Sequence, residues 1–327
     1  MSWRDFPKVE LHLHLEGAAP PAFIRGMAAE KNEDLSGIFT EDGSYVYRDF
    51  WHFLDVYAAA ASVLQTPEDF HRLTRAVFAV SAANGVVFCE TFLSPDFCGG
   101  RDVGAWKDYL AAIRAAADEA EREDGITLRG VVTAIRHFGP DKARETAICA
   151  AETAGDWLVG FGLAGDERSG EPQNFAWAFD CAREAGLGIT VHAGEWRGPE
   201  SVRNALEVTP SRLGHGVRAI EDPGLVELLA EEGIVLEVCP GSNVTLGVYP
   251  SLSAHPIAKL REAGVPVTIS TDDPPFFQTT MSQEFEGLDQ TFGWSEEDFD
   301  ALNATALKAA FCDETTRTRV AKRLERP

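Results

Sequence analysis

The sequence predicts an α/β protein with a (β/α)8 TIM-barrel fold, extra helices after the first strand and a helical segment at the C-terminus. Short apolar segments alternate with longer helical patterns, and this alternation repeats eight times, which is typical of a parallel barrel. Several of the short segments have the continuous Val-, Ile- and Leu-rich sequences of buried parallel strands. A doubly wound sheet is the competing architecture. In chain order, the expected strands cover residues 9–15, 86–92, 128–134, 158–164, 188–193, 212–216, 234–239 and 266–271.

The helical patterns between these strands have recognisable limits. The long segment 16–85 carries the extra helices, and its aromatic-rich stretch FWHFLDVY (50–57) suits a lid over a binding site. Residues 105–123 place apolar and charged side chains at helical spacing. Residues 223–233 begin with a proline and end with a glycine, which are usual signals for the two ends of a helix. We expect the segment 295–311 to form a capped helix near the C-terminus.

Length and composition are those of one large domain. The chain has 327 residues, of which 45% are hydrophobic, and barrels of this size form a single unit, so we expect one domain over 1–327. The formal net charge is −23, from 52 acidic and 29 basic residues. Because nucleic-acid binding rests largely on Lys and Arg contacts with phosphates, this charge argues against a nucleic-acid partner and against an anionic membrane surface. A small neutral substrate, in contrast, is not repelled by this negative charge.

Cysteine spacing and hydropathy indicate a reducing compartment. Six cysteines occur without a CxxC pair, and in a chain of this length we expect them to be reduced thiols. The N-terminal sequence has no apolar signal region, and no apolar run of 18 residues occurs. We therefore expect a cytoplasmic protein that does not span a membrane, and the sequence leaves its oligomeric state open.

Four of the eight histidines lie in or at the ends of expected strands. His12 and His14 are two residues apart on the first strand, so both side chains share one face. His192 closes the fifth strand, His215 lies in the sixth, and Asp272 follows the eighth. Taken singly, each has a structural interpretation, such as a polar pair on a strand or a turn signal. Because the strand ends of a barrel form one rim, and imidazoles with a carboxylate are standard zinc ligands, their joint placement predicts a metal site.

The remaining polar candidates are less specific. Glu195 follows the fifth strand and can act near the metal, or it can be an ordinary loop carboxylate. His137 follows the third strand at the end of the barrel that carries the site. We expect His52 and His71 to be surface or lid residues and His255 to lie at a helix start.

Six motifs stand out along the chain. In order they are PKVELHLHLEG (7–17), LAGDE (163–167), VHAGE (191–195), LGHGVRAIED (213–222), CPGSN (239–243) and STDDP (270–274). HxH alone is shared with other amidohydrolases and with metal-dependent phosphoesterases, whereas the HAGE, GHG and TDDP motifs together are specific. In this order the motifs resemble the adenosine deaminase family, and the resemblance extends from residue 7 to about residue 311.

The resemblance implies one catalytic zinc ion per chain, and iron in its place stays open. It implies that Glu195 is the acid that protonates N1 of a purine, and that His215 orients the attacking water and accepts its proton. This division of roles between Glu195 and His215 suits general acid catalysis, because charge develops on N1 when C6 is attacked. The implied zinc ligands are His12, His14, His192 and Asp272.

The resemblance also implies contacts with the rest of the substrate. Asp273 would donate to N7, which requires a protonated carboxyl, and a neighbouring charge together with exclusion of water favours that form. The backbone N–H of Gly165 would meet N3. Glu16 matches a family aspartate that contacts the ribose, with one extra methylene. Glycine stands at 162 and at 241 where the family usually has other residues, which leaves the pocket shape open.

These roles together predict a zinc-dependent aminohydrolase of purine salvage that converts adenosine and 2′-deoxyadenosine to inosine and ammonia. LAGDE and residues 244–256 favour adenosine, whereas HLHLEG and DDPPFF have close counterparts among adenine deaminases, so adenine, which would give hypoxanthine, is the alternative. Another N6-amino purine nucleoside is also open. Two other classes remain: a non-catalytic nucleoside-binding member and a metallophosphoesterase. The complete set of acid, base and metal ligands argues against the first, and the lack of basic phosphate-binding motifs argues against the second.

Overall fold

Eight parallel strands form a barrel in the computed structural model, which describes residues 2–325. Met1, Arg326 and Pro327, which the domain expected over 1–327 includes, lie outside the described residues. Neighbouring strands pair in chain order, from β1 to β8. The strands are β1 (Lys8–His14), β2 (Val86–Leu93), β3 (Thr127–Ile135), β4 (Leu158–Ala164), β5 (Gly188–Ala193), β6 (Arg212–His215), β7 (Val235–Val238) and β8 (Val267–Ile269).

The predicted TIM barrel is confirmed, and the doubly wound alternative is wrong. A single bridge between Leu13 and Asp272 brings the last strand against the first. Its two backbone hydrogen bonds run from His14 N to the carbonyl of Asp272 and from Asp272 N to the carbonyl of His12, both at 3.0 Å. The segment that closes the barrel therefore carries three of the predicted metal ligands.

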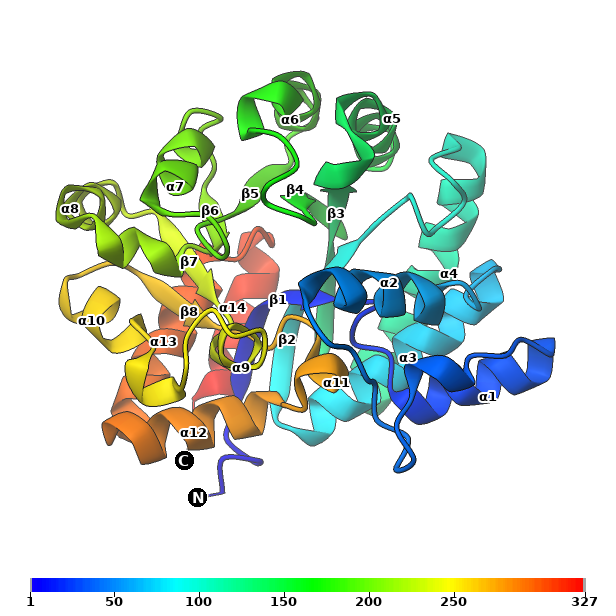
Figure 1. Cartoon of the computed structure of the whole chain (residues 1–327), viewed down its shortest axis with the longest axis horizontal. Coiled ribbons are helices and arrows are strands. Elements are labelled where there is room, and N and C mark those ends of the chain that lie inside the picture. Colours follow the sequence, from blue (N-terminus) through cyan, green and yellow to red (C-terminus); the bar gives the residue numbers. More distant parts are fainter. Residues whose placement is uncertain (1, 326–327) are drawn as a thin grey trace.

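The helices surround the strands (Figure 1). Within residues 2–325, none is long and apolar enough to cross a membrane. The α-helices are α1 (Pro21–Lys31), α2 (Phe50–Ala61), α3 (Pro67–Ala83), α4 (Val103–Glu123), α5 (Pro140–Ala151), α6 (Ala176–Glu184), α7 (Pro199–Leu206), α8 (Pro223–Glu232), α9 (Pro240–Thr245), α10 (Ile257–Glu262), α11 (Pro274–Phe277), α12 (Met281–Phe292), α13 (Glu296–Ala309) and α14 (Glu314–Leu324). Short 3-10 turns are η1 (Ser36–Ile38), η2 (Arg136–Phe138), η3 (Pro172–Phe175), η4 (Val217–Glu221) and η5 (Leu252–Ala254).

The extra helices after the first strand are α1, α2 and α3, and local capping fixes where two of them start. Asp49 accepts a hydrogen bond from the backbone N–H of His52 and so begins α2 at Phe50. Thr66 and Asp69 form a reciprocal capping box at the start of α3. The predicted C-terminal helix is α13, and α14 follows it as a second helix that the sequence pattern did not indicate.

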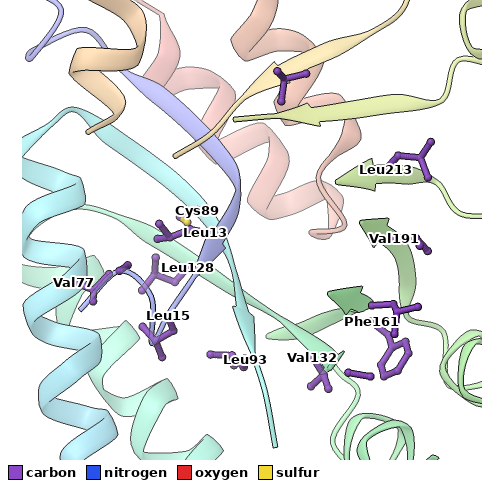
Figure 2. Close-up of a cluster of buried hydrophobic side chains, with 14 of the residues drawn as sticks. Leu13, Leu15, Val77, Cys89, Leu93, Leu128, Val132, Phe161, Val191 and Leu213 are labelled. Carbon is purple, nitrogen blue, oxygen red and sulfur yellow. The ribbon is translucent and has the colours of Figure 1, made fainter. Parts of the chain in front are cut away.

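Two apolar clusters hold the helices against the strands. Figure 2 shows part of the larger one, in which Leu13 of β1, Cys89 of β2 and Leu128 of β3 lie close together. The smaller cluster packs Leu11 and Phe88 against the C-terminal helices. Because side chains alternate along a strand, the residues that pack against helices alternate on β1 with His12 and His14, which are left to face the barrel interior.

Candidate active site

A cavity of about 520 Å³ opens at the end of the barrel where the predicted site residues lie, which is the end that carries active sites in this fold. Phe50, Trp51 and Phe53 of α2, from the stretch that the sequence analysis considered suited to a lid, form part of its wall. No Lys or Arg lines it among the described residues. The predicted site residues in its wall are His14, Glu16, His137, Gly165, His192, Glu195, His215, Asp272 and Asp273.

The four predicted metal ligands converge on one point. Each offers a ligand atom, and these atoms lie within 4.8 Å of one another. Asp272 Oδ1 lies 3.4 Å from His12 Nε2 and 3.3 Å from His14 Nε2, while His14 Nε2 lies 3.3 Å from His192 Nε2. Within residues 2–325, the buried His12 Nε2 makes no hydrogen bond. Three imidazole nitrogens and a carboxylate, one of them buried without a partner, fit a divalent transition metal.

Side chains behind these ligands hold them in place, and the sequence analysis missed them. Glu237 Oε2 lies 2.9 Å from His12 Nδ1, which leaves Nε2 of that ring to face the metal position. Ser242 donates its hydroxyl hydrogen to Asp272 Oδ2 at 2.7 Å. Such partners orient metal ligands. A glutamate in the middle of the apolar strand sequence IVLEVC was the available signal for Glu237.

Glu237 also begins a chain of buried charges that reaches the C-terminal segment. Arg212 donates from Nε to Glu237 at 2.5 Å and from Nη1 to Glu90 at 2.7 Å. Arg212 Nη1 also donates to the carbonyl of Ala309, and Glu90 accepts from the backbone N–H of Phe311. The metal position is thereby linked to the residues between α13 and α14.

Backbone geometry is unusual at two site residues. His215 has φ of 60° and Asp272 has φ of 67°, in the left-handed region that non-glycine residues seldom occupy. Such conformations persist where the surroundings impose them, and they cluster at functional sites.

Burial controls the charge state of the acids in the cavity. Glu195 is 8% exposed, and burial followed by the charge of Asp272 raises its pKa well above the ordinary value. Burial, then the charges of Asp272 and Glu195, does the same for the pKa of Asp273. Asp273 Oδ1 is buried and has no hydrogen-bond partner among residues 2–325. Both carboxyl groups can therefore hold a proton near neutral pH, as the expected roles require.

The loop after β5, which carries Glu195, is fastened by one further carboxylate. Glu167 accepts hydrogen bonds from the backbone N–H groups of Gly194, Glu195, Trp196 and Arg197 and from the Ser201 hydroxyl. Five donors to one buried side chain fix the position from which Glu195 projects. The sequence analysis gave this residue of LAGDE no role.

The glycines that mark the motifs have separate explanations. Gly165 has φ of +89°, and a Cβ there would lie 2.8 Å from Nδ1 of His137. A Cβ at Gly241 would lie 2.1 Å from Glu284 Oε1, so glycine admits that buried carboxyl, which accepts from Gly241 N at 3.0 Å. Gly162 lies in β4 beside Thr190.

The other histidines divide between surface and interior. His52 and His71 are partly exposed on α2 and α3, as expected. His137 lines the cavity and its Nδ1 accepts from Asp166 N at 3.3 Å. His255 lies just before α10, but its side chain is buried and reaches toward the site through Asn243.

Comparison with known proteins identifies the family. Residues 7–327 match the adenosine deaminase family model. An adenine deaminase from Rhizobium rhizogenes is 47% identical over 319 residues, which are 97% of this chain and 98% of that protein. The structure of an adenine deaminase from Arthrobacter aurescens has a TM-score of 0.87 at 29% identity and covers 97% of this chain and 98% of its own. An amidohydrolase from Burkholderia ambifaria, solved with bound zinc, has a TM-score of 0.86 at 26% identity, with 98% and 91% covered. The chain therefore belongs to the adenosine deaminase family and is a hydrolytic deaminase.

Proposed function

We propose that this protein is an adenine deaminase, which hydrolyses adenine to hypoxanthine and ammonia. The observation that carries the proposal is the 47% identity, over nearly the whole of both chains, with a protein named adenine deaminase. The solved adenine deaminase, at 29% identity and a TM-score of 0.87, supports the same substrate. Adenosine, the substrate that the sequence motifs favoured, becomes the second candidate.

The surroundings of Glu16 support a free base. Its carboxyl is 4% exposed, and it lies 3.5 Å from the Tyr57 hydroxyl and 3.9 Å from the Cys98 thiol. Each carboxyl oxygen of Glu16 therefore has a protein neighbour, and its remaining lone pair is left for a ligand in the cavity. Free adenine carries a ring N–H where a nucleoside carries its sugar, and a carboxyl group in the cavity wall can accept from that N–H.

The residues of the cavity wall also limit the charge of the ligand. Since no Lys or Arg lines it within residues 2–325, a phosphate group would find no cationic partner there. A neutral base meets no such penalty. The metallophosphoesterase interpretation is disfavoured for the same reason.

We further propose that His12, His14, His192 and Asp272 hold one zinc ion. When bound, the ion supplies a Lewis acid that lowers the pKa of a water molecule toward about 7. His215 orients the attacking water. Glu195, with its raised pKa, delivers a proton to N1 as C6 is attacked.

Asp273 and Gly165 complete the recognition of the ring. Protonated Asp273 donates to N7, since the side chain lines the cavity and burial raises its pKa. The Gly165 backbone N–H donates to N3. A pure binding protein needs neither an acid nor a metal set, so the non-catalytic alternative explains less of the site.

Ammonia release from adenine and adenosine tests the substrate. We expect kcat/KM to be at least about tenfold higher for adenine, and Glu16→Ala to lower kcat/KM for adenine by roughly 10- to 150-fold, because a donor loses an acceptor worth about 1.5–3 kcal/mol. Glu41→Ala, at an exposed position, is the matched control and should leave both substrates unaffected. A tenfold preference for adenosine would overturn the substrate while leaving the proposed metal and acid untouched.

A further inference from the structure

The two ring nitrogens of His215 have different surroundings. Nε2 lies 3.8 Å from Glu195 Oε2 and 4.0 Å from Asp272 Oδ2, so it is directed toward the reacting groups. Nδ1 lies 3.3 Å from Nδ2 of Asn243. A neutral imidazole has one N–H and one lone pair, so whichever nitrogen holds the proton decides whether Nε2 donates or accepts.

The proton positions can be followed from a backbone group whose direction is fixed. Ile257 N donates to His255 Nδ1 at 3.2 Å, so this nitrogen presents a lone pair and holds no proton. Burial lowers the pKa of His255 to about 3, which makes the ring neutral at pH 7. Its single proton is therefore on Nε2.

The proton on His255 Nε2 fixes the orientation of the Asn243 amide, and this orientation decides which group of Asn243 faces His215. His255 Nε2–H lies 3.1 Å from Asn243 Oδ1, which accepts. A carboxamide has one oxygen and one NH2 group, so the group left to face His215 is the donor Nδ2. His215 Nδ1 has to accept from it, and the proton of the neutral ring is then on Nε2.

Packing keeps the three side chains in this order. His255 is 3% exposed, and the ring of Tyr249 meets it edge to face, with centroids 5.1 Å apart. The backbone carbonyl of Asn243 accepts from the backbone N–H groups of Val248 and Tyr249 at 2.9 and 3.2 Å, which fixes the main chain at this residue. Rotation of the amide would also set an N–H of Asn243 against the N–H of His255.

We propose that Asn243 and His255 are positioning residues that hold His215 as its Nε2–H tautomer, so that His215 meets the attacking water as a hydrogen-bond donor. The Asp272 carboxylate, whose Oδ2 lies 4.0 Å from Nε2, supports this, because an N–H directed toward an acceptor is favourable and a lone pair there is not. The family resemblance led us to expect His215 as proton acceptor. With Nε2 protonated, the proton released by the water has to pass to a carboxylate. Glu195 becomes a carboxylate once it has given its own proton to N1, and it lies nearer to Nε2 than Asp272 does.

The tautomer can be read directly in the resting protein. Zinc-loaded wild-type protein with 15N-labelled histidine should show His215 Nδ1 as an unprotonated nitrogen and Nε2 as a protonated one at pH 7. A His215→Asn sample identifies the signal among the eight histidines. A protonated Nδ1 in wild type would overturn the inference. The role in catalysis rests on the proposed function, but this measurement does not, since it needs no substrate.

A single isosteric substitution tests whether Asn243 sets the tautomer of His215. Asn243→Asp presents an acceptor to both rings, so we expect the His215 proton to move to Nδ1, and kcat to fall at least about tenfold with metal content unchanged. Asn174→Asp is the control, because this asparagine is exposed and its Oδ1 is the contacting atom. It should change neither the tautomer of His215 nor kcat. A loss of kcat without a change of tautomer, or a change of tautomer with full activity, would refute the positioning role. If Asn243→Asp does not fold, the wild-type spectrum still decides.

Discussion

Glu237→Gln tests how the barrel interior supports the metal site. Glu237 is fully buried between His12, whose Nδ1 lies 2.9 Å from Oε2, and Arg212, whose Nε donates to Oε1. The substitution keeps the shape of the side chain and removes the charge between an imidazole and a guanidinium. Removing one partner of a buried ion pair costs about 3–5 kcal/mol. Arg212 keeps Glu90 at 2.7 Å, so we expect the lower end, about 3 kcal/mol.

That free energy corresponds to a measurable change in Tm. An unfolding entropy of about 2.1 cal/mol/K per residue gives roughly 0.7 kcal/mol/K for 327 residues, so Tm should fall by about 4 °C. Loss of the partner that orients His12 should also weaken zinc binding by roughly 10- to 100-fold. Calorimetry with and without metal and a titration against a chromogenic chelator measure the two effects.

Glu90→Gln is the matched control for this experiment. It breaks the other half of the Arg212 pair but does not contact His12, so it should lower Tm by a similar amount and leave zinc affinity at the wild-type value. If Glu237→Gln binds zinc as tightly as wild type, or if both variants weaken zinc equally, then Glu237 does not act through His12.

Three other experiments test the acid, the metal and a buried carboxyl. Glu195→Gln should lower kcat by at least about 100-fold with metal content unchanged, and near-normal turnover would place the acid elsewhere. Removing metal with a chelator should abolish ammonia release and lower Tm, and added zinc should restore both; full activity of metal-free protein would refute the site. Burial raises the pKa of Glu284 from 4.5 to about 7, so its stabilising contribution is present below the unfolded pKa and is lost as pH rises through the folded one. The Tm of Glu284→Gln, which stays neutral, should therefore improve relative to wild type as pH rises from about 4.5 to about 7, and a constant difference would show that Glu284 does not titrate there.

The barrel was predictable because its strands are buried on both faces and therefore have distinctive sequences. The bounds expected for 158–164 and 188–193 are those of β4 and β5. β7 and β8 each begin one residue later than expected, and they also end earlier, where the last expected residues already belong to the segments that carry site residues. Periodicity also placed His12 and His14 on one face, and the structure brings them together with His192 and Asp272.

The residues that support the ligands were not predictable in the same way. Asn243 and His255 lie on either side of η5, and their contact depends on how that loop folds. Glu237 and Arg212 are adjacent only because β6 pairs with β7. A charged residue inside an apolar strand sequence, such as Glu237 in IVLEVC, indicates that a partner is needed, but only the fold shows which residue that partner is.

The substrate was hard to predict for a similar reason, because the residues that distinguish adenine from adenosine lie far apart in the sequence. The motifs supply the groups proposed to contact the purine ring, and adenine and adenosine have that ring in common. What separates the two substrates is the sugar, and Glu16, which contacts Tyr57 and Cys98, is the residue proposed to distinguish them. These residues come from the loop after β1, from α2 and from the loop after β2, so no single stretch of sequence contains the distinction. Replacing the family aspartate by Glu16 could therefore be noticed in the sequence, but its consequence depends on whether protein or sugar lies beside the longer side chain. The contacts with Tyr57 and Cys98 place protein beside Glu16, and the proposed contact between its carboxyl and the ring N–H of adenine is what Glu16→Ala would remove.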